Sequence, residues 1–520
     1  MTDTYRPRTT VYIAALVALG GFLFGFDASV ISGVVPFIIP EFSLNELQVG
    51  LVVGAPTLAG IIAGLSAGPT ADYIGRKRVL MILAALYTVS ALGSAFAPNY
   101  QTLVIARAIG GFAFASLGIA PIYIAEIAPH ARRGFLVSFN QFNIMIGFSV
   151  AYFANYYMLQ LSQSGADWVS ALAIDRHAWR WMLGLEILPA GFWLLALLFI
   201  PETPRWLALN GRVDAARTVL GRIRPRDRVE TTLQEILESG SDAGKSLLAR
   251  VGEVLSPKLR LPILIGITVG VFQQVTGINA VYFYAPTIFE QSGVGTNAAF
   301  AQATLIGITN IVFTIVAMLL IDRLGRKPLL LIGLLGIVAS MGIAGYGFQQ
   351  ATYQLDTAAV EQLDEGIDRE ALRGLAGMRF DNDLEFKRAA EDVLGVQAAR
   401  NHQARLVQAA IEVNPTIVLI GILGFVAAFA MSLGPVMWVL FSEIFPNRVR
   451  GVALGITSVF NSASSFMVQF LFPWELANLG NALTFYIFAG LGVIGLLLVN
   501  RLLPETKGKS LEELEAVLAR

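Results

Sequence analysis

Long apolar segments separated by short polar connections make up most of the chain. Segments of about 20 apolar residues, enough for a helix to cross a bilayer, fall near residues 11–37, 47–68, 79–97, 101–124, 135–160, 178–200, 261–290, 298–321, 328–348, 416–441, 450–474 and 481–503. The pattern predicts twelve membrane-spanning helices and an all-α membrane protein. The first apolar run, from about Val11 to Ile39, is too long for a signal-peptide core, so we expect it to be the first span.

Basic residues are distributed unevenly between the short connections. Connections near 38–46, 98–100, 291–297 and 475–480 contain no Lys or Arg. The alternate connections carry the basic residues Arg76, Lys77, Arg78, Arg132, Arg133, Arg323, Arg326, Lys327, Arg448 and Arg450. By the positive-inside rule, we expect these connections and both termini to be cytoplasmic, in a multi-pass protein of the cell membrane.

Three short motifs occur twice, in the same order. Asp72–Lys77 recurs as Asp322–Lys327, an offset of 250 residues. The motif that starts at Glu126 recurs from Glu443, an offset of 317, and Pro201-Glu202-Thr203 recurs as Pro504-Glu505-Thr506, an offset of 303. Ordered repeats of this kind predict two parallel six-helix bundles, at residues 1–203 and 259–508.

The change in offset locates the extra chain. The offset between the repeated motifs grows from 250 to 317 residues. This growth places an insertion in the second half, and we assign it to the polar residues 349–414, on the outer side. Its helical composition fits a small external helical cap, and an unstructured loop fits equally well. Residues 204–258, rich in Arg, Glu and Asp, are expected to be a cytoplasmic linker with short amphipathic helices, and residues 509–520 a cytoplasmic tail.

The composition excludes several classes of function. The chain is 55% hydrophobic and 14% charged, whereas soluble domains carry about 25% charged residues. Its formal net charge of zero gives no reason to expect nucleic acid, and the absence of cysteine excludes disulfides and thiolate metal sites. The histidines are scattered without metal-ligand spacing: His130, His177 and His402. We expect no metal, no cofactor and no enzymatic reaction.

One acid lies well inside the first span. An isolated charge at the position of Asp27 costs roughly 2.5–3.5 kcal/mol on insertion scales, so this carboxyl needs a partner or a proton. Arg107, in the fourth span, is the basic residue at comparable depth in the same half. We expect the two to pair. The pair either couples transport to protons or only ties two helices together, and the first hypothesis is favoured because buried ionisable groups in spans are usually functional.

Charged residues also form two matching sets near the cytoplasmic ends of the spans. Topology alone requires positive charge there but no acidic partners, so the duplicated arrangement favours a gate whose charges pair across the halves. The alternative is that they orient and cap helices. The expected gate residues are Asp72, Arg76, Glu126, Arg133 and Glu202 in one half, and Asp322, Arg326, Glu443 and Arg450 in the other.

Three amides interrupt the apolar run of the seventh span: Gln273, Gln274 and Asn279. On a straight helix, Gln274 and Asn279 would point roughly 100° and 240° away from Gln273. Gly277 lies between them, and a local break there would turn Asn279 toward the other two. Because broken helices at mid-membrane hold the solute in many transporters, we expect a binding site at this point.

Other neutral polar groups occur within the spans: Gln141, Asn310, Asn461 and the indole of Trp438. Singly, each would more often bond a neighbouring helix than a ligand. Together with the three amides they describe a pocket of neutral donors and acceptors beside an aromatic face. Such a pocket suits an uncharged polyhydroxy solute, since each hydroxyl both donates and accepts, and a ring covers the C–H face of a sugar.

The motifs together resemble the sugar porter family of the major facilitator superfamily over nearly the whole chain. Gly68–Arg78 is similar to the superfamily's loop between spans two and three, and the family's own signatures are similar to Pro201–Trp206, Gln273–Asn279, Gly434–Trp438 and Pro504–Gly508. Bacterial xylose/hexose–proton symporters share Gly25-Phe26-Asp27. The resemblance implies proton coupling at Asp27 with Arg107, and sugar contacts at Phe24, Gln141, Gln273, Gln274, Asn279, Asn310, Trp438 and Asn461.

Some positions depart from the family pattern. Phe283 replaces the first Tyr of a common pair, and Asn461-Ser462 replaces a Gln-Trp pair of xylose symporters, so a hexose such as glucose is as well supported as xylose. We therefore predict a monomeric proton-coupled monosaccharide symporter that imports a pentose or hexose by alternating access. Its partners are a monosaccharide, protons and the lipid bilayer, with no nucleic acid. A facilitative uniporter is the alternative, and a transporter-like sugar sensor is a more distant one.

Overall fold

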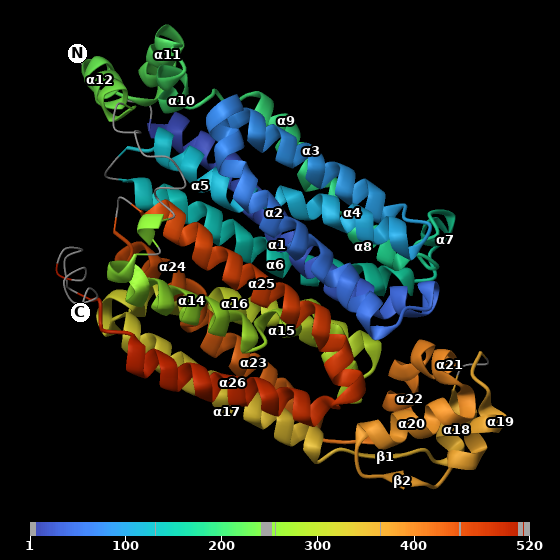
Figure 1. The fold of residues 1–520 in the computed structure, drawn as a ribbon. Helices are drawn as coiled ribbons and strands as arrows, with labels where there is room; N and C mark the ends of the chain where they lie inside the picture. Colours follow the sequence, from blue (N-terminus) through green and yellow to red (C-terminus); the bar gives the residue numbers. More distant parts are fainter. Residues whose placement is uncertain are drawn as a thin grey trace. The chain divides into compact units, whose positions relative to one another are not determined.

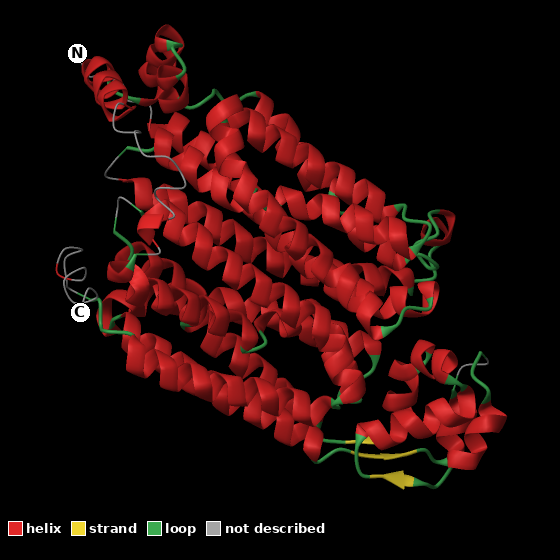
Figure 2. Ribbon diagram, viewed as in Figure 1, coloured by secondary structure: helices red, strands yellow, loops and turns green. Residues whose placement is uncertain are grey.

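The computed structural model describes residues 7–129, 132–240, 252–254, 256–363, 366–446, 449–507 and 513. Within them, twelve helical segments are long and apolar enough to cross a membrane, which confirms the predicted number of spans (Figures 1 and 2). The first six are α1 (Pro7–Phe42), α2 (Glu46–Ile74), α3 (Arg76–Ala95), α4 (Tyr100–Ala113) with α5 (Ser116–Ile127), α6 (Arg133–Ser162), and α8 (Ala178–Gly184) with α9 (Ile187–Leu198).

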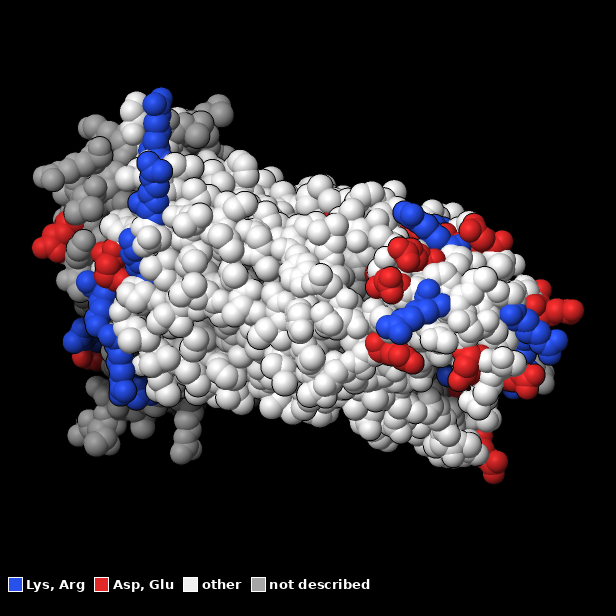
Figure 3. Space-filling model, turned by 90° about the horizontal axis from the view of Figure 1, so that it is seen from below, with Lys and Arg blue, Asp and Glu red and all other residues white. Residues whose placement is uncertain are grey.

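The second six spans follow the same order. They are α14 (Arg260–Val275) with α15 (Ile278–Gln291), α16 (Thr296–Leu324), α17 (Arg326–Gln349), α23 (Pro415–Met431) with α24 (Leu433–Ile444), α25 (Arg450–Asn478) and α26 (Asn481–Leu502). On the face drawn in Figure 3, charged side chains gather at two ends and a broad uncharged surface separates them. An uncharged band of this kind is what contact with lipid requires.

The described residues form two compact units. The first comprises Met1–Ala28, Ala55–Ala151 and Leu183–Gly252, and the second Ser29–Gly54, Tyr152–Met182 and Glu253–Arg520. The unit boundaries cut through α1, α2, α6 and the sixth span, so part of each belongs with the C-terminal spans. The predicted division into an N-terminal and a C-terminal bundle stays a prediction.

Glycines bring α1 and α6 into close contact in the first unit. A Cβ added at Gly25 would overlap the backbone of Ile144, and one added at Gly147 would overlap the backbone of Phe22. Small residues at helix interfaces allow this approach, which is the usual means of packing helices in lipid. Nearby, the Trp193 indole donates to the carbonyl of Leu16 at 3.0 Å.

Residues between α17 and α23 form a small folded cap. It contains α18 (Thr357–Gln362), α19 (Arg369–Leu372), the 3-10 turn η4 (Arg373–Leu375), α20 (Asp383–Leu394), α21 (Val396–Asn401) and α22 (Gln403–Ala410). Its three strands, β1 (Thr352–Gln354), β2 (Arg379–Phe380) and β3 (Ile411–Glu412), pair antiparallel in the order β2-β1-β3 (Figure 2).

The cap has its own apolar core. The rings of Tyr353 and Phe386 stack with centroids 5.6 Å apart, and burial raises the pKa of the Tyr353 phenol far above its usual value. The helical cap was one of two alternatives that the sequence left open, and it is the one found. The sheet was not predicted, because strands of two or three residues are too short to show a period of two.

At the end of the spans that carries the cap, here called the cap end, the two halves of the chain are in contact within the second unit. The Tyr152 hydroxyl of α6 donates to the carbonyl of Tyr282 in α15 at 2.6 Å. Phe37 of α1 packs on Phe300 of α16, with ring centroids 6.3 Å apart. A Cβ at Gly50 of α2 would overlap the backbone of Phe470 in α25. Spans of the two halves therefore pack closely at the cap end.

Short helices follow the sixth span, as predicted for the linker. They are α10 (Pro204–Leu209), α11 (Val213–Ile223), the turn η2 (Arg226–Arg228) and α12 (Val229–Gly240). A second 3-10 turn, η3 (Pro257–Leu259), precedes α14, and α7 (Asp167–Ala171) lies between α6 and α8. Residues 241–251 of the linker and 514–520 of the predicted tail lie outside the described residues.

Candidate functional site

The seventh span is broken where the sequence places its amides. α14 ends at Val275 and α15 begins at Ile278, with Gly277 between them in the left-handed conformation at φ 98°. Residues with a side chain rarely adopt this φ, and a Cβ here would lie 2.8 Å from the ring of Phe488. The predicted break is confirmed, and its cause is a glycine that both turns the chain and admits an aromatic ring.

Three of the predicted amides form one hydrogen-bonded group. Asn461 of α25 donates to Oε1 of Gln273 at 2.7 Å and to the carbonyl of Gly270 at 2.8 Å. Gln274 donates to Oε1 of Gln273 at 3.1 Å and to Oδ1 of Asn461 at 3.3 Å, while Gln273 donates to the carbonyl of Leu433 at 3.2 Å. Each amide thus holds the next, which fixes their orientation in a buried place.

The break turns Asn279 into the same group. Its amide donates to Oε1 of Gln274 at 2.8 Å and to the hydroxyl of Ser465 at 2.6 Å. Gln469, one turn along α25, donates to the same hydroxyl at 2.7 Å. We call Gln273, Gln274, Asn279, Asn461, Ser465 and Gln469 the amide cluster. The sequence analysis missed Ser465 and Gln469, although their spacing of four and eight residues from Asn461 places all three on one helix face.

The other predicted sugar contacts have other neighbours among the described residues. Asn310 of α16 accepts from the Tyr282 hydroxyl at 3.1 Å. Trp438 of α24 is 48% exposed, with its ring 6.0 Å from Phe441. Gln141 and Phe24 belong to the first unit, where Gln141 is exposed on α6. Phe24 packs edge-on against Phe114 at 4.7 Å. The structure therefore brings together four of the eight predicted sugar contacts, Gln273, Gln274, Asn279 and Asn461.

The predicted pair of Asp27 and Arg107 forms in the first unit. Nη1 of Arg107 donates to Oδ1 of Asp27, and both side chains are 2% exposed. Glu186, which joins α8 to α9 in the sixth span, is also 2% exposed and interacts electrostatically with both. Glu186 was not among the predicted site residues, although an acidic residue between two apolar segments of one span was visible in the sequence.

The three residues, here called the charge cluster, cannot all be ionised at low cost. One guanidinium balances one carboxylate, and a second buried carboxylate would leave an uncompensated negative charge in a medium of low dielectric constant. Protonation of one of the two acids removes that charge.

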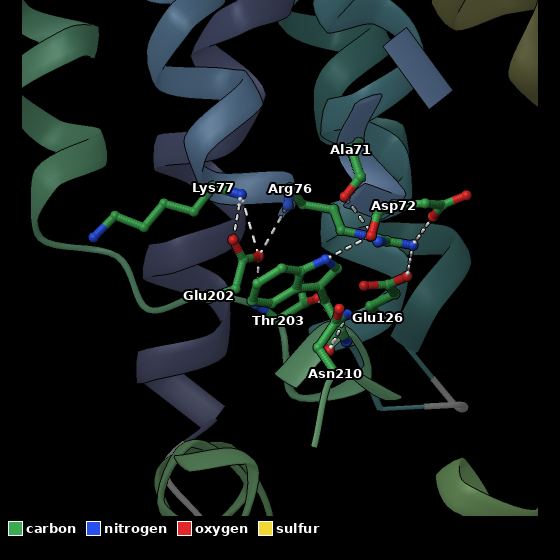
Figure 4. A network of polar contacts seen from close by, with 9 residues as sticks. Ala71, Asp72, Arg76, Lys77, Glu126, Glu202, Thr203 and Asn210 are labelled. Carbon is green, nitrogen blue, oxygen red and sulfur yellow. Dashed lines mark hydrogen bonds and ion pairs between the residues drawn. The ribbon is translucent and has the colours of Figure 1, made fainter. Parts of the chain in front are cut away.

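The charged motifs form a corner between α2 and α3 in the first unit (Figure 4). Arg76 pairs with Asp72 at 2.7 Å and with Glu126 of α5 at 3.2 Å. Glu202 accepts from the backbone N–H groups of Arg76 at 3.1 Å and Lys77 at 3.0 Å. A carboxylate at this position satisfies free N–H groups of α3 and complements the positive end of its dipole.

The second half repeats the arginine–glutamate pair and the glutamate–N–H contacts of this corner. Arg326 pairs with Glu443 at 2.8 Å, and Glu505 accepts from the N–H groups of Arg326 and Lys327 at 3.1 Å each. Thr506 donates to Glu443 at 2.6 Å. The duplication found in the motifs is thus a duplication of contacts.

Each of these ion pairs lies within one half of the chain. The sequence analysis expected the charges to pair across the halves in a closed gate, and that role stays a prediction. Of the remaining gate residues, Arg133 is exposed at the start of α6, and Arg450 donates to the carbonyl of Phe445 at 3.1 Å. The side chain of Asp322 lies outside what the structure describes.

Twelve spans, a broken helix and two buried polar clusters define a multi-pass membrane transporter. Comparison with known proteins identifies the family of transporters to which it belongs. The chain matches the profile of the sugar (and other) transporter family over residues 13–360 and 394–518. The chain belongs to this family, and it has the major facilitator fold; it is a transporter and not an enzyme.

Relatives of known name cover nearly the whole chain. It is 33% identical to the arabinose-proton symporter of Bacillus subtilis (strain 168), over 99% of this chain and 96% of the relative. It is also 33% identical to the D-xylose-proton symporter of Escherichia coli (strain K12), over 99% and 97%. The inward open conformation of the xylose transporter XylE from E. coli aligns with a TM-score of 0.72 at 31% identity, over 97% of this chain and 99% of that one.

Substitutions at the arginine and at an acid of the charge cluster are expected to lower the stability of the protein by different amounts. Replacing Arg107 with Leu leaves two carboxyls without a cation, and we expect the free energy of unfolding to fall by about 3–5 kcal/mol. Asp27→Asn keeps a hydrogen-bond acceptor for Arg107, so its loss should be smaller. Thermal unfolding of the purified variants in detergent measures both, and equal losses would contradict the assignment.

The geometry of the corner predicts that stability depends on a glycine at position 75. Gly75 has φ 104°, and a Cβ there would overlap the carboxylate of Glu202. We expect Gly75→Ala to lower the free energy of unfolding by about 1–3 kcal/mol. Gly64→Ala in α2, where a Cβ meets nothing within 4 Å, is the matched control and should be neutral or slightly stabilising in the same thermal assay.

Proposed function

We propose that this protein imports a monosaccharide together with a proton by alternating access. The observation that carries the proposal is the charge cluster, in which two acids share one arginine in a span interior. A structural ion pair needs one acid, whereas a site that takes up and releases a proton needs a group whose charge changes. The second acid provides that group.

The amide cluster supports a sugar as the solute. Its side chains are neutral donors and acceptors, and they are already oriented by one another at a helix break in mid-span. An anionic solute would be expected to meet an unpaired cation there, and the cluster contains none. The relatives are named for arabinose and xylose, so a pentose or a hexose is the proposed substrate class.

The charge distribution supports an orientation. Short connections opposite the cap end carry the basic residues, so we place them and both termini in the cytoplasm and the cap outside. The outer end is then the closed one in this structure. The two corners would lie on the cytoplasmic side, where their charges serve as a gate that pairs across the halves when that side closes.

Uptake into proteoliposomes tests the coupling. We expect concentrative uptake of arabinose, xylose or glucose only with an inwardly directed proton gradient. Uptake that reaches the same final level without the gradient would identify a facilitative uniporter instead. Sugar binding without any uptake would identify a sensor.

Asp27→Asn separates exchange from accumulation. In this variant Glu186 alone balances Arg107, so the cluster has no second carboxyl to take up a proton, and we expect sugar exchange at close to the normal rate but no accumulation against a gradient. Glu41→Gln, a carboxyl-to-amide change on the same helix at an exposed ion pair, is the control and should accumulate sugar normally. Full accumulation by Asp27→Asn would move the coupling to another residue.

A further inference from the structure

The cap is fixed to the C-terminal half. Asp383 at the start of α20 accepts from the backbone N–H of Asn481 at 3.2 Å, and so holds the first turn of α26. Lys387 pairs with Asp383 at 2.7 Å and donates to the carbonyl of Leu476 in α25 at 3.2 Å. Both side chains are about one-tenth exposed, at 11% and 8%. Because the cap is also joined to α17 and α23, it moves with the C-terminal half.

The same cap also reaches the N-terminal half. Nη2 of Arg400 in α21 lies 2.8 Å from Oε1 of Glu46 in α2, and Nε of Arg400 lies 3.9 Å from Glu391 of α20. Arg400 and Glu46 are 28% and 21% exposed, so the pair is partly shielded from water. It joins two parts of the chain that are separated by about 350 residues and belong to different halves.

Glu46 is held in place by the start of its own helix. Asn45 and Gln48 form a reciprocal cap, in which the N–H of Asn45 donates to Gln48 at 2.9 Å and the N–H of Gln48 donates to Asn45 at 2.9 Å. The first turn of α2 is therefore ordered, and Glu46 needs little further ordering to meet Arg400. Ordered partners lose less entropy on pairing than two free surface chains do.

A cavity of about 490 Å³ surrounds this contact. It is lined by the first turn of α2, by α20 to α22 and by the end of α25, including Trp474 and Asn478. Open space therefore lies beside the ion pair, between the first turn of α2 and the cap helices that line the cavity. A contact of this kind separates without exposing much apolar area.

We propose that Glu46 and Arg400 form a latch that holds the outer end closed. In alternating access, the outer ends of the halves must part before solute enters from outside. In the predicted division into two six-helix bundles, the cap travels with the C-terminal bundle and Glu46 with the N-terminal one, so the pair breaks whenever the outer end opens. The latch rests on the alternating access of the proposed function but not on the identity of the sugar or on proton coupling.

Part of the cap lies outside what the family profile accounts for. The profile matches residues 13–360 and 394–518, so it omits residues 361–393, which include α19 and nearly all of α20. Glu391 and Lys387 lie in this segment. Arg400 itself lies in the matched part of the chain, and Glu391, which it faces at 3.9 Å, lies in the omitted segment.

Thiol labelling measures opening of the outer end. The chain has no cysteine, so Phe300→Cys introduces a single thiol at a residue that is 1% exposed and packs on Phe37 across the halves. A membrane-impermeant maleimide added outside right-side-out vesicles reaches this thiol only when the outer end opens. The readout needs no sugar, so it remains informative even if the proposed transport activity fails.

Breaking the latch should speed labelling. In the Phe300→Cys background, we expect Arg400→Ala and Glu46→Gln each to label about threefold to fivefold faster, as for the loss of a modest ion pair. The charge swap Glu46→Arg with Arg400→Glu should restore slow labelling. The control is Arg180→Ala, which breaks an ion pair with Glu41 at 3.2 Å and similar exposure, but within the N-terminal half.

Two results would overturn the latch. Unchanged labelling in both single variants would show that the pair does not hold the outer end. Faster labelling that the charge swap fails to reverse, or that Arg180→Ala reproduces, would assign the effect to loosened packing. Glu46→Gln replaces only a carboxylate by an amide of the same size in an ordered helix turn. The test therefore remains valid if Arg400→Ala fails to fold.

Discussion

The bilayer interior provides no water to satisfy polar groups, and this constraint explains where every important side chain of this protein lies. Two acids and an arginine enter the spans only because they meet one another, and the five amides and the serine of the amide cluster enter only because they bond one another. Both groups are built from several helices: the first from α1, α4 and the junction of α8 with α9, the second from α14, α15 and α25. Their cost in lipid forces the helices to associate, so the same contacts that stabilise the fold assemble the functional groups.

Glycines at breaks in the spans are the second feature that brings polar groups together. Gly277 turns the seventh span so that Asn279 joins the amides of the preceding helix, which a straight helix would keep apart. The corner at Gly75 and its repeat at Gly325 use the same freedom, at φ 104° and 95°, to bring a carboxylate onto the first N–H groups of the next helix. Glycine at these positions decides which polar groups meet. The same local arrangement of glycine, carboxylate and N–H groups therefore occurs in both halves.

The cap adds a contact between the two halves of the chain, from Arg400 to Glu46. It is held to α25 and α26 by a shielded ion pair and to α2 by a weaker one beside a cavity. Unequal attachments of this kind let a domain move with one half while restraining the other. The closed cap end of this structure, with Tyr152 on Tyr282 and Phe37 on Phe300, is the state in which such a restraint acts.

The sequence by itself determined the twelve spans, the duplicated motifs and the pairing of Asp27 with Arg107. Apolar length and the cost of an isolated charge in lipid are local properties that a linear pattern records. The break at Gly277 was also visible there, because three amides could not share one helix face. Only the tertiary structure decided that Glu186 joins the charge cluster, that Ser465 and Gln469 complete the amide cluster, and that the insertion at residues 349–414 folds around a short sheet and reaches Glu46. Those contacts join residues far apart in the chain, and their partners follow from how helices pack and not from any spacing along the sequence.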